Sequence, residues 1–444
     1  MQGQMGRGDA NSRARRLHSG YALRTGVRQA WPAAATLGRM TTSSDPTNAA
    51  GGRPLQAWQV ISGGVLALVL AIGVARFAYT PLLPLMQAQA GLSDLVAGWL
   101  AATNYLGYMS GALLAAWLES PLWRRRLYSA GLLIGLLSTA LMALTSNVWL
   151  WALSRYLGGL SGAAGMLLGS GLVLGWLMRH GRRPELGLYF TGLGLGIVVS
   201  ALGAMVMDRL GLDWRGHWWG FVAIGALALI PAWAWRPPVP PAPAAHAGAA
   251  AVLPARRWIL QMMAMYFCAG WGFVISATFT VAIVERQPLL AGQGPWAWLL
   301  VGLAATPAVF IWDFIARRIG DLQALLLAML LQLVSVLLPA WSQGLAAALA
   351  GALLYGATFI GIVSLTLALV GRRSPANPGK AMARLTLSYG AAQVSAPALA
   401  GAMAQASGSY TGALWLTAAV LGLGAGLLLW LLQEERRGRE RPVK

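Results

Sequence analysis

Long apolar runs, separated by short polar turns, extend almost without a break from Trp58 to Gln433. A helix that crosses a bilayer needs about 20 apolar residues, and a helix with its turn takes about 30. The apolar stretch therefore predicts about twelve transmembrane helices and an all-α polytopic membrane protein. The predicted helices are residues 60–85, 94–118, 127–145, 149–176, 185–208, 217–235, 257–284, 296–316, 321–340, 344–370, 381–405 and 411–432.

The low charge content favours lipid rather than water as the solvent. Charged residues make up 10% of the chain and hydrophobic residues 57%, whereas soluble domains carry about 25% charged residues. The net charge of +20 comes from arginines in the tails and short turns, with no basic helix face, so nucleic-acid binding is not expected. One cysteine, Cys268, and four unpaired histidines predict no metal site. No phosphate-binding loop or other cofactor motif is present, so no cofactor is expected.

Basic residues alternate between successive turns, as the positive-inside rule requires. With the N-terminus inside, the inner turns carry 14 arginines and lysines and the outer connections carry 3. The inner residues are Arg124, Arg125, Arg126, Arg179, Arg182, Arg183, Arg236, Arg256, Arg257, Arg317, Arg318, Arg372, Arg373 and Lys380, and the outer ones are Arg209, Arg215 and Arg286. We therefore expect a bacterial inner-membrane protein with both termini in the cytoplasm.

The turn between the sixth and seventh predicted helices is long and rich in proline and alanine, so it cannot continue a helix. It divides the chain into two six-helix halves that resemble each other, an arrangement typical of transporters with parallel repeats. Before the first helix we expect a disordered tail, with Met40 as an alternative start of translation. The predicted segments are 1–57 (basic tail), 58–235 (first half), 236–257 (cytoplasmic linker), 258–433 (second half) and 434–444 (cytoplasmic tail).

Two arginines lie within apolar helices and are the strongest candidates for a binding site. Arg76 lies past the middle of the first helix, and Arg155 lies in the outer half of the fourth. A charge at the bilayer centre costs about 2.5–3.5 kcal/mol on insertion scales, so both side chains are expected to face the bundle interior or water. A guanidinium there can bind a carboxylate or phosphate through two parallel hydrogen bonds. The alternative is that each arginine binds helix-end carbonyls or a neighbouring acid.

Polar and aromatic side chains within the helices are candidates for the remainder of a solute cavity. Asn104 and Tyr108 are four residues apart and share a helix face. For any one of these residues the alternative is a hydrogen bond that packs two helices together. The candidates are Tyr79, Thr80, Asn104, Tyr108, Trp271, Thr278, Tyr355 and Tyr389, with Tyr105, Tyr266, Thr358 and Gln393 as further members.

Two N-terminal segments carry a family resemblance. GVARFAYTPLLPLM at 73–86 and AGWLAATNYLGYMSGALLAA at 97–116 resemble the YbfB/YjiJ-type branch of the major facilitator superfamily. Arg155 and Gly159 are similar to the Arg-x-x-x-Gly element of the fourth helix in this superfamily. The resemblance covers about residues 58–433. It implies the superfamily fold, a central cavity faced by the first and fourth helices, alternating access and proton coupling.

The resemblance also implies gating residues at the inner helix ends. The inner-turn motif of the superfamily is only partly present, since Ala115 stands where an acid is expected and Asp313 where glycine is usual. Asp313 and Arg317 are four residues apart, which predicts a local salt bridge. The candidate gating residues are Arg124, Asp313, Arg317, Arg318 and Arg384.

These observations predict a secondary transporter of a small organic solute, with an organic anion as one candidate. The predicted partners are the solute and the lipid bilayer, and we expect a monomer. Efflux of amphipathic toxic compounds is an alternative, although the fifth helix lacks the Gly-Pro pair typical of exporters. A membrane-embedded enzyme is a remote alternative, because the 13 acids are scattered and few could perform acid–base chemistry. A solute receptor is the remaining alternative.

Overall fold

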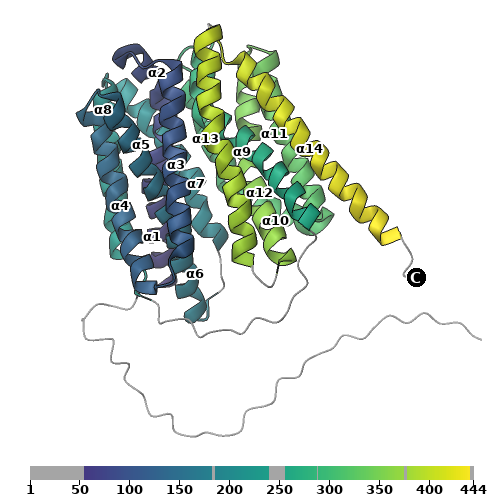
Figure 1. The fold of residues 1–444 in the computed structure, drawn as a ribbon. Helices are drawn as coiled ribbons and strands as arrows, with labels where there is room; N and C mark the ends of the chain where they lie inside the picture. Colours follow the sequence, from purple (N-terminus) through teal and green to yellow (C-terminus); the bar gives the residue numbers. More distant parts are fainter. Residues whose placement is uncertain (1–54, 183–185, 240–255, 288, 375–377, 441–444) are drawn as a thin grey trace, which may run out of the picture. The chain divides into compact units, whose positions relative to one another are not determined.

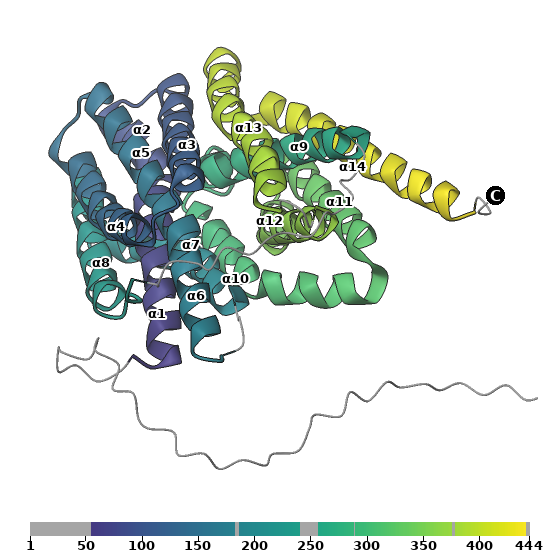
Figure 2. The ribbon, with the colours of Figure 1, turned by 60° about the horizontal axis from the view of Figure 1, so that its bottom comes forward.

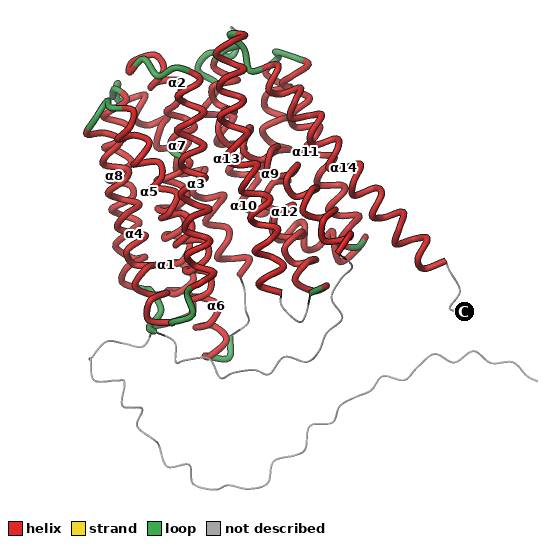
Figure 3. Tube along the Cα trace, in the orientation of Figure 1, coloured by secondary structure: helices red, strands yellow, loops and turns green. Residues whose placement is uncertain are grey.

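The computed structural model describes residues 55–182, 186–239, 256–287, 289–374 and 378–440. Within these ranges the chain is built from helices and the short turns that join them, without a strand (Figure 3). The predicted tail with Met40 and most of the predicted linker lie outside the described residues.

The described helices form twelve successive segments, as the sequence predicts (Figure 1). Two segments contain a π-helical turn: the first is α1 (Ala57–Leu68), η1 (Val69–Phe77) and α2 (Tyr79–Ala90), and the fourth is α5 (Val148–Ala163), η2 (Ala164–Gly169) and α6 (Ser170–Arg179). The others are α3 (Asp94–Trp117), α4 (Pro121–Leu144), α7 (Leu186–Arg209), α8 (Trp214–Ala234), α9 (Arg256–Glu285), α10 (Gly294–Ile319), α11 (Asp321–Trp341), α12 (Leu345–Arg373), α13 (Pro378–Ser407) and α14 (Thr411–Glu440).

Ten of these segments are long and apolar enough to cross a membrane by themselves, and α3 and α13 are the two that are not. The two helices lie beside each other in both ribbon views (Figures 1 and 2). Polar and small side chains are tolerated along them because much of each helix faces protein rather than lipid.

Three predicted boundaries are wrong by more than one helical turn, and the first of them is the end of α2 at Ala90 rather than at residue 85. Helix α4 begins at Pro121 rather than at residue 127, so the arginines 124–126 lie in its first turns. Proline suits the first position of a helix because its φ angle is already helical, and arginine stems extend back to water. Helix α14 continues to Glu440, well past residue 432. Ion pairs of Glu434 with Arg257 and of Glu435 with Arg373 support this extra length.

Helices α3 and α7 of the first half meet α13 and α10 of the second half through backbone contacts at glycine. A Cβ atom on Gly98 would lie 2.3 Å from the carbonyl oxygen of Pro397, and one on Gly194 would lie 2.5 Å from the backbone nitrogen of Thr306. The Trp298 indole also donates to the Ser200 hydroxyl at 2.9 Å. These contacts form two long seams between the halves, α3 with α13 and α7 with α10, and the chemistry between the seams defines the candidate site.

Candidate functional site

Arg76 lies in the last turn of η1, near the middle of the first membrane segment. The amide of Ala78 donates to the carbonyl of Gly73, which is the wide i to i−5 bond of a π-helix. Such turns occur often at functional sites because they redirect one or two side chains. Gly73 and Gly196 allow η1 to approach the backbone of α7 closely. The turn is therefore held firmly while Arg76 extends into the bundle.

The Arg76 side chain is buried among aromatic rings from both halves. Its guanidinium carbon lies 4.1 Å from the ring centre of Tyr105, 5.3 Å from that of Tyr108 and 5.8 Å from that of Phe273. Its exposed fraction is 7%. Atoms Nε and Nη2 have no hydrogen-bond partner among the described residues. A buried charge with unused donors is costly, so this site favours an added anion.

Arg155 is equally buried, but both of its terminal nitrogens donate within the protein, and its Nε has no partner among the described residues. Atom Nη1 donates to the carbonyls of Ala75 at 3.2 Å and Arg76 at 3.3 Å. Atom Nη2 also donates to the Arg76 carbonyl, at 3.4 Å. This is the carbonyl-binding alternative that the sequence leaves open.

Several predicted site residues tie helices together close to the two arginines. Asn104 Nδ2 donates to the Arg155 carbonyl at 2.8 Å. The Tyr79 hydroxyl donates to the Ala97 carbonyl at 3.1 Å, and its ring lies 4.5 Å from the Arg155 guanidinium carbon. Thr80 crosses between the halves, since its hydroxyl donates to the Ala277 carbonyl at 2.6 Å. These bonds fix the position of Arg76 relative to both halves.

In the second half, Phe273 joins two predicted tyrosines to the surroundings of Arg76. Its ring centre lies 6.4 Å from that of Tyr355 and 5.9 Å from that of Tyr389. The Tyr355 hydroxyl donates to the Phe273 carbonyl at 3.1 Å. Sequence reasoning missed Phe273, because an apolar residue in an apolar helix carries no distinguishing signal.

Two other predicted residues of this half, Trp271 and Thr278, have weaker links to the cluster. Thr278 is buried in α9. Trp271 is half-buried and pairs with Phe267 of its own helix, with ring centres 6.1 Å apart. The structure thus brings Tyr108, Tyr355 and Tyr389 into the aromatic surroundings of Arg76 and leaves Trp271 outside them.

A polar network joins the halves at the end of the bundle where α2 ends and α3 begins. Asp94 accepts hydrogen bonds from Arg286, from the Tyr410 hydroxyl at 2.9 Å and from Gln87 at 2.6 Å. Arg286 and Asp94 also form an ion pair, in which the Asp94 side chain is 12% exposed. Asp94 is separated in sequence from Arg286 by 192 positions and from Tyr410 by 316 positions, so no local sequence pattern predicts this network. It closes this end, which we name the Asp94 end.

The opposite end, which carries the arginine-rich turns, contains a cavity of about 800 Å³ between the two halves. Its lining includes Met109, Glu119, Arg124, Arg179, Met382 and Thr386. Met109 lines the cavity from α3 and packs against Gly390 of α13, where an added Cβ would lie 1.7 Å from its sulfur. We name this end the arginine-rich end.

The candidate gating residues lie at this end in different surroundings. Arg124 lines the cavity. Asp313 and Arg317 form the predicted local salt bridge, at 2.8 Å within α10. Arg318 lies over the ring of Phe314, and Arg384 is exposed on α13. Of the five candidate gating residues, therefore, Arg124 is the one recorded in the lining of this cavity.

The geometry of two six-helix halves around a central charged site is that of a transporter, and sequence comparison names the family. Residues 68–429 match the family described as uncharacterised MFS-type transporter YbfB, where MFS denotes the major facilitator superfamily. The chain belongs to this family. The predicted resemblance and fold class are therefore confirmed, and the YbfB-type protein is a multi-pass membrane transporter.

Individual relatives of the YbfB-type protein are distant. The uncharacterized transporter mfc1 of Schizosaccharomyces pombe is 26% identical over 132 residues, which are 30% of this chain and 27% of that protein. Among solved structures, a mutant of the nucleoside transporter NupG has a TM-score of 0.65 at 13% identity, covering 84% of this chain and 98% of its own. A bacterial homologue of the human lysosomal transporter Spinster has a TM-score of 0.64 at 14% identity, with 88% and 100% covered. At such identities the structural likeness establishes the fold alone.

Replacing Arg155 with methionine is expected to destabilise the YbfB-type transporter by about 1–3 kcal/mol, because buried carbonyls of η1 lose their donors. The measurement is thermal unfolding of the purified protein in detergent. An unchanged or raised melting temperature would show that Arg155 does not hold the π-helical turn.

Neutralising Asp94 with asparagine or Arg286 with glutamine is expected to open the Asp94 end. Hydrogen bonds between charged groups contribute about 1.5–3 kcal/mol, so the open population should rise about tenfold or more. Spin labels at Ala90 and Ser407, one on each half, would report the distance between the halves in both variants. The swapped pair Asp94→Arg with Arg286→Asp should restore the wild-type distance, and a swap that behaves like the single variants would contradict this assignment.

Proposed function

We propose that this YbfB-type transporter carries a small organic anion with an aromatic or planar apolar body, and that Arg76 binds its acidic group. The observation that carries the proposal is the buried Arg76 guanidinium, which has two nitrogens without partners among the described residues and aromatic rings around it. A carboxylate beside Nε and Nη2 would satisfy both donors in one planar contact. The rings of Tyr105 and Phe273 would pack against the body of the solute.

The charge of the site argues for an anion over a cation. Aromatic rings by themselves also attract cations. Here the guanidiniums of Arg76 and Arg155 both lie within the site, and no carboxylate contacts either of them in the described ranges. Two uncompensated positive charges in a medium of low dielectric constant would repel a cationic solute strongly.

Alternating access is supported by the difference between the two ends of the bundle. The Asp94 end is closed by the network around Asp94, whereas the arginine-rich end contains the large cavity. By the positive-inside rule the cavity faces the cytoplasm of a bacterial inner-membrane protein with both termini inside. Met109 of α3 and Gly390 of α13 pack together across the two halves beside this cavity. We propose that the chain performs this cycle as a monomer.

Proton coupling, which the family resemblance implies, is assigned here to Asp94. This carboxylate joins the two halves through Arg286 and Tyr410. Protonation would remove its charge attraction to Arg286 and thereby favour opening of that end. In proteoliposomes, solute uptake by the Asp94→Asn variant should not respond to an imposed pH gradient, while solute exchange should persist. Uptake that still follows the gradient would exclude Asp94 as the coupling group.

The test of the substrate class is a thermal-shift screen of the purified transporter, since a ligand that prefers the folded state raises its stability. The panel contains aromatic carboxylates, aliphatic carboxylates, sugars, nucleosides and amphipathic cations. Aromatic carboxylates should give the largest shift, and flux of the best ligand into proteoliposomes should follow. Stabilisation by amphipathic cations alone would favour the efflux alternative. The structural argument for that alternative is the apolar lining of the cavity, which includes Leu113 and Leu387.

A further inference from the structure

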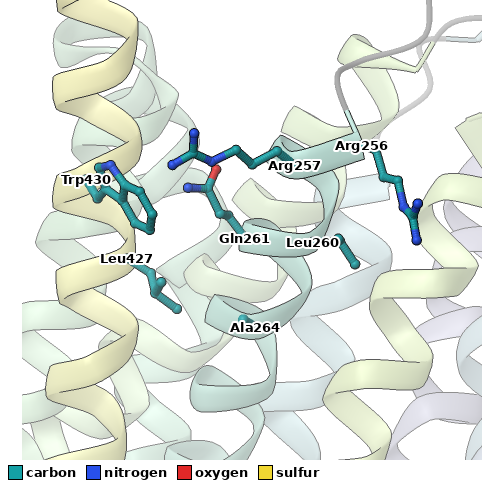
Figure 4. Close-up of a pocket in the computed structure, with 7 residues that line it drawn as sticks. All are labelled: Arg256, Arg257, Leu260, Gln261, Ala264, Leu427 and Trp430. Carbon is teal, nitrogen blue, oxygen red and sulfur yellow. The ribbon is translucent and has the colours of Figure 1, made fainter.

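A groove on the lipid-facing side of the second half lies between the start of α9 and the last turns of α14 (Figure 4). Its volume is about 550 Å³. The lining includes Arg256, Arg257, Gln261, Leu260, Leu427 and Trp430. Because α9 begins at Arg256, the groove is at the arginine-rich end, where the helices leave the bilayer. It is remote from Arg76 and belongs to neither the solute site nor the central cavity.

The upper part of the groove is basic. Arg257 forms an ion pair with Glu434 at 3.1 Å, and its guanidinium carbon lies 4.8 Å from the ring centre of Trp430. Arg256 has no ion pair within the part of the chain that the structure describes. Arg257 thus faces one carboxylate, whereas the Arg256 side chain extends away from Arg257 and Trp430 (Figure 4). The N-terminus of the 30-residue helix α9 adds partial positive charge. This part of the groove therefore attracts anions.

The decisive residue is Gln261, whose side chain is 8% exposed and points with Arg257 towards Trp430 (Figure 4). Neither its Nε2 nor its Oε1 atom has a hydrogen-bond partner among the described residues. A buried amide without partners is costly, so a ligand with polar oxygens is expected beside it. At 1.5 Å per residue, Gln261 lies about 6 Å deeper along α9 than Arg257.

The lower part of the groove is apolar and open to lipid. Leu260 is 53% exposed and Trp430 44% exposed, and Leu427 continues this surface along α14. From the membrane surface inward, the groove therefore presents first positive charge, then one amide and then apolar side chains. A glycerophospholipid has the complementary sequence of phosphate, glycerol ester and acyl chain.

We propose that this groove binds one anionic phospholipid. Its phosphate contacts the guanidinium of Arg257 beside the N-terminus of α9, since basic pockets between helices at this membrane surface bind anionic headgroups. An ester or glycerol oxygen contacts the amide of Gln261, and an acyl chain lies along Leu427 and Trp430. The site needs no solute and is independent of the proposed transport function.

The test is native mass spectrometry of the full-length protein in detergent, with phosphatidylglycerol, phosphatidylcholine of the same acyl chains, or glycerol 3-phosphate added. The wild type should retain one phosphatidylglycerol about fivefold more than phosphatidylcholine, and Arg257→Ala should lower that retention about fivefold. Gln261→Leu should lower retention too, without a lower melting temperature, because it removes two unpaired polar atoms. Arg317→Ala, which removes an ion-paired arginine at the same end, should behave as the wild type.

Three outcomes would overturn the proposal. One is equal retention of phosphatidylglycerol by the wild type, Arg257→Ala and Gln261→Leu. A second is displacement of phosphatidylglycerol by equimolar glycerol 3-phosphate, which would indicate a site for a free phosphate. For the third, benzoylphenylalanine at position 427 is photolysed in lipid nanodiscs. Adducts to phosphatidylglycerol support the site, whereas adducts to this chain or to a second copy would show that protein fills the groove.

Discussion

Replacing Arg76 with methionine is expected to weaken binding of the solute while raising the stability of the solute-free protein. Loss of a charge-assisted contact of about 1.5–3 kcal/mol should weaken binding of the best ligand from the screen about 10- to 100-fold. The same change removes a buried charge with two unpaired nitrogens, and an apolar side chain of similar length is often neutral or stabilising in such a place. Thermal unfolding with and without ligand measures both effects in one experiment.

Arg155→Met is the matched control for this experiment, because it also removes a buried guanidinium from the same region. The two variants should change stability in opposite directions, since Arg155 donates to carbonyls and Arg76 keeps unused donors. Arg76→Lys should retain the charge and lose most of the binding, because an ammonium cannot form the planar paired contact. Ligand binding by Arg76→Met at wild-type affinity would remove Arg76 from the site.

Replacing Gly98 with leucine is expected to hold the Asp94 end open and to stop transport. The backbone of α3 touches that of α13 at this position, where a Cβ would lie 2.3 Å from the Pro397 carbonyl oxygen. Overpacking costs about 1–3 kcal/mol, which should shift the population away from the closed end about 10- to 100-fold. To measure this, Thr80→Cys is introduced in a Cys268→Ser background. The new cysteine should react with a water-soluble maleimide about 10- to 100-fold faster in the Gly98→Leu protein.

Gly422→Leu is the control for the glycine experiment, because a Cβ on Gly422 has no atom within 4 Å. This variant should keep wild-type labelling and transport. The Gly98→Leu protein should still fold, since only the seam between α3 and α13 is disturbed. Wild-type labelling at position 80 together with normal transport in Gly98→Leu would show that this seam does not move during the cycle.

The sequence by itself determined the helices and their number. Lipid leaves no water to bond exposed backbone, so apolar runs of this length must be helical. The alternation of arginines between turns supported the count independently. The same reasoning identified Arg76 and Arg155, because a charge inside an apolar run can be seen in the sequence without knowing how the helices pack. The boundaries of α4 and α14 were predicted less well, since arginine and glutamate at helix ends resemble turn residues.

Only the tertiary structure decided what these residues do. Arg76 and Arg155 look alike in sequence, yet Arg155 donates to η1 and Arg76 keeps two free nitrogens among the described residues. The partner of Asp94 is Arg286, 192 positions away, and Phe273 is an apolar residue among many. Such pairings depend on which helix faces meet across the two halves. Contacts at Gly98 and Gly194 fix those faces, and hydrophobic periodicity along one chain carries no information about them.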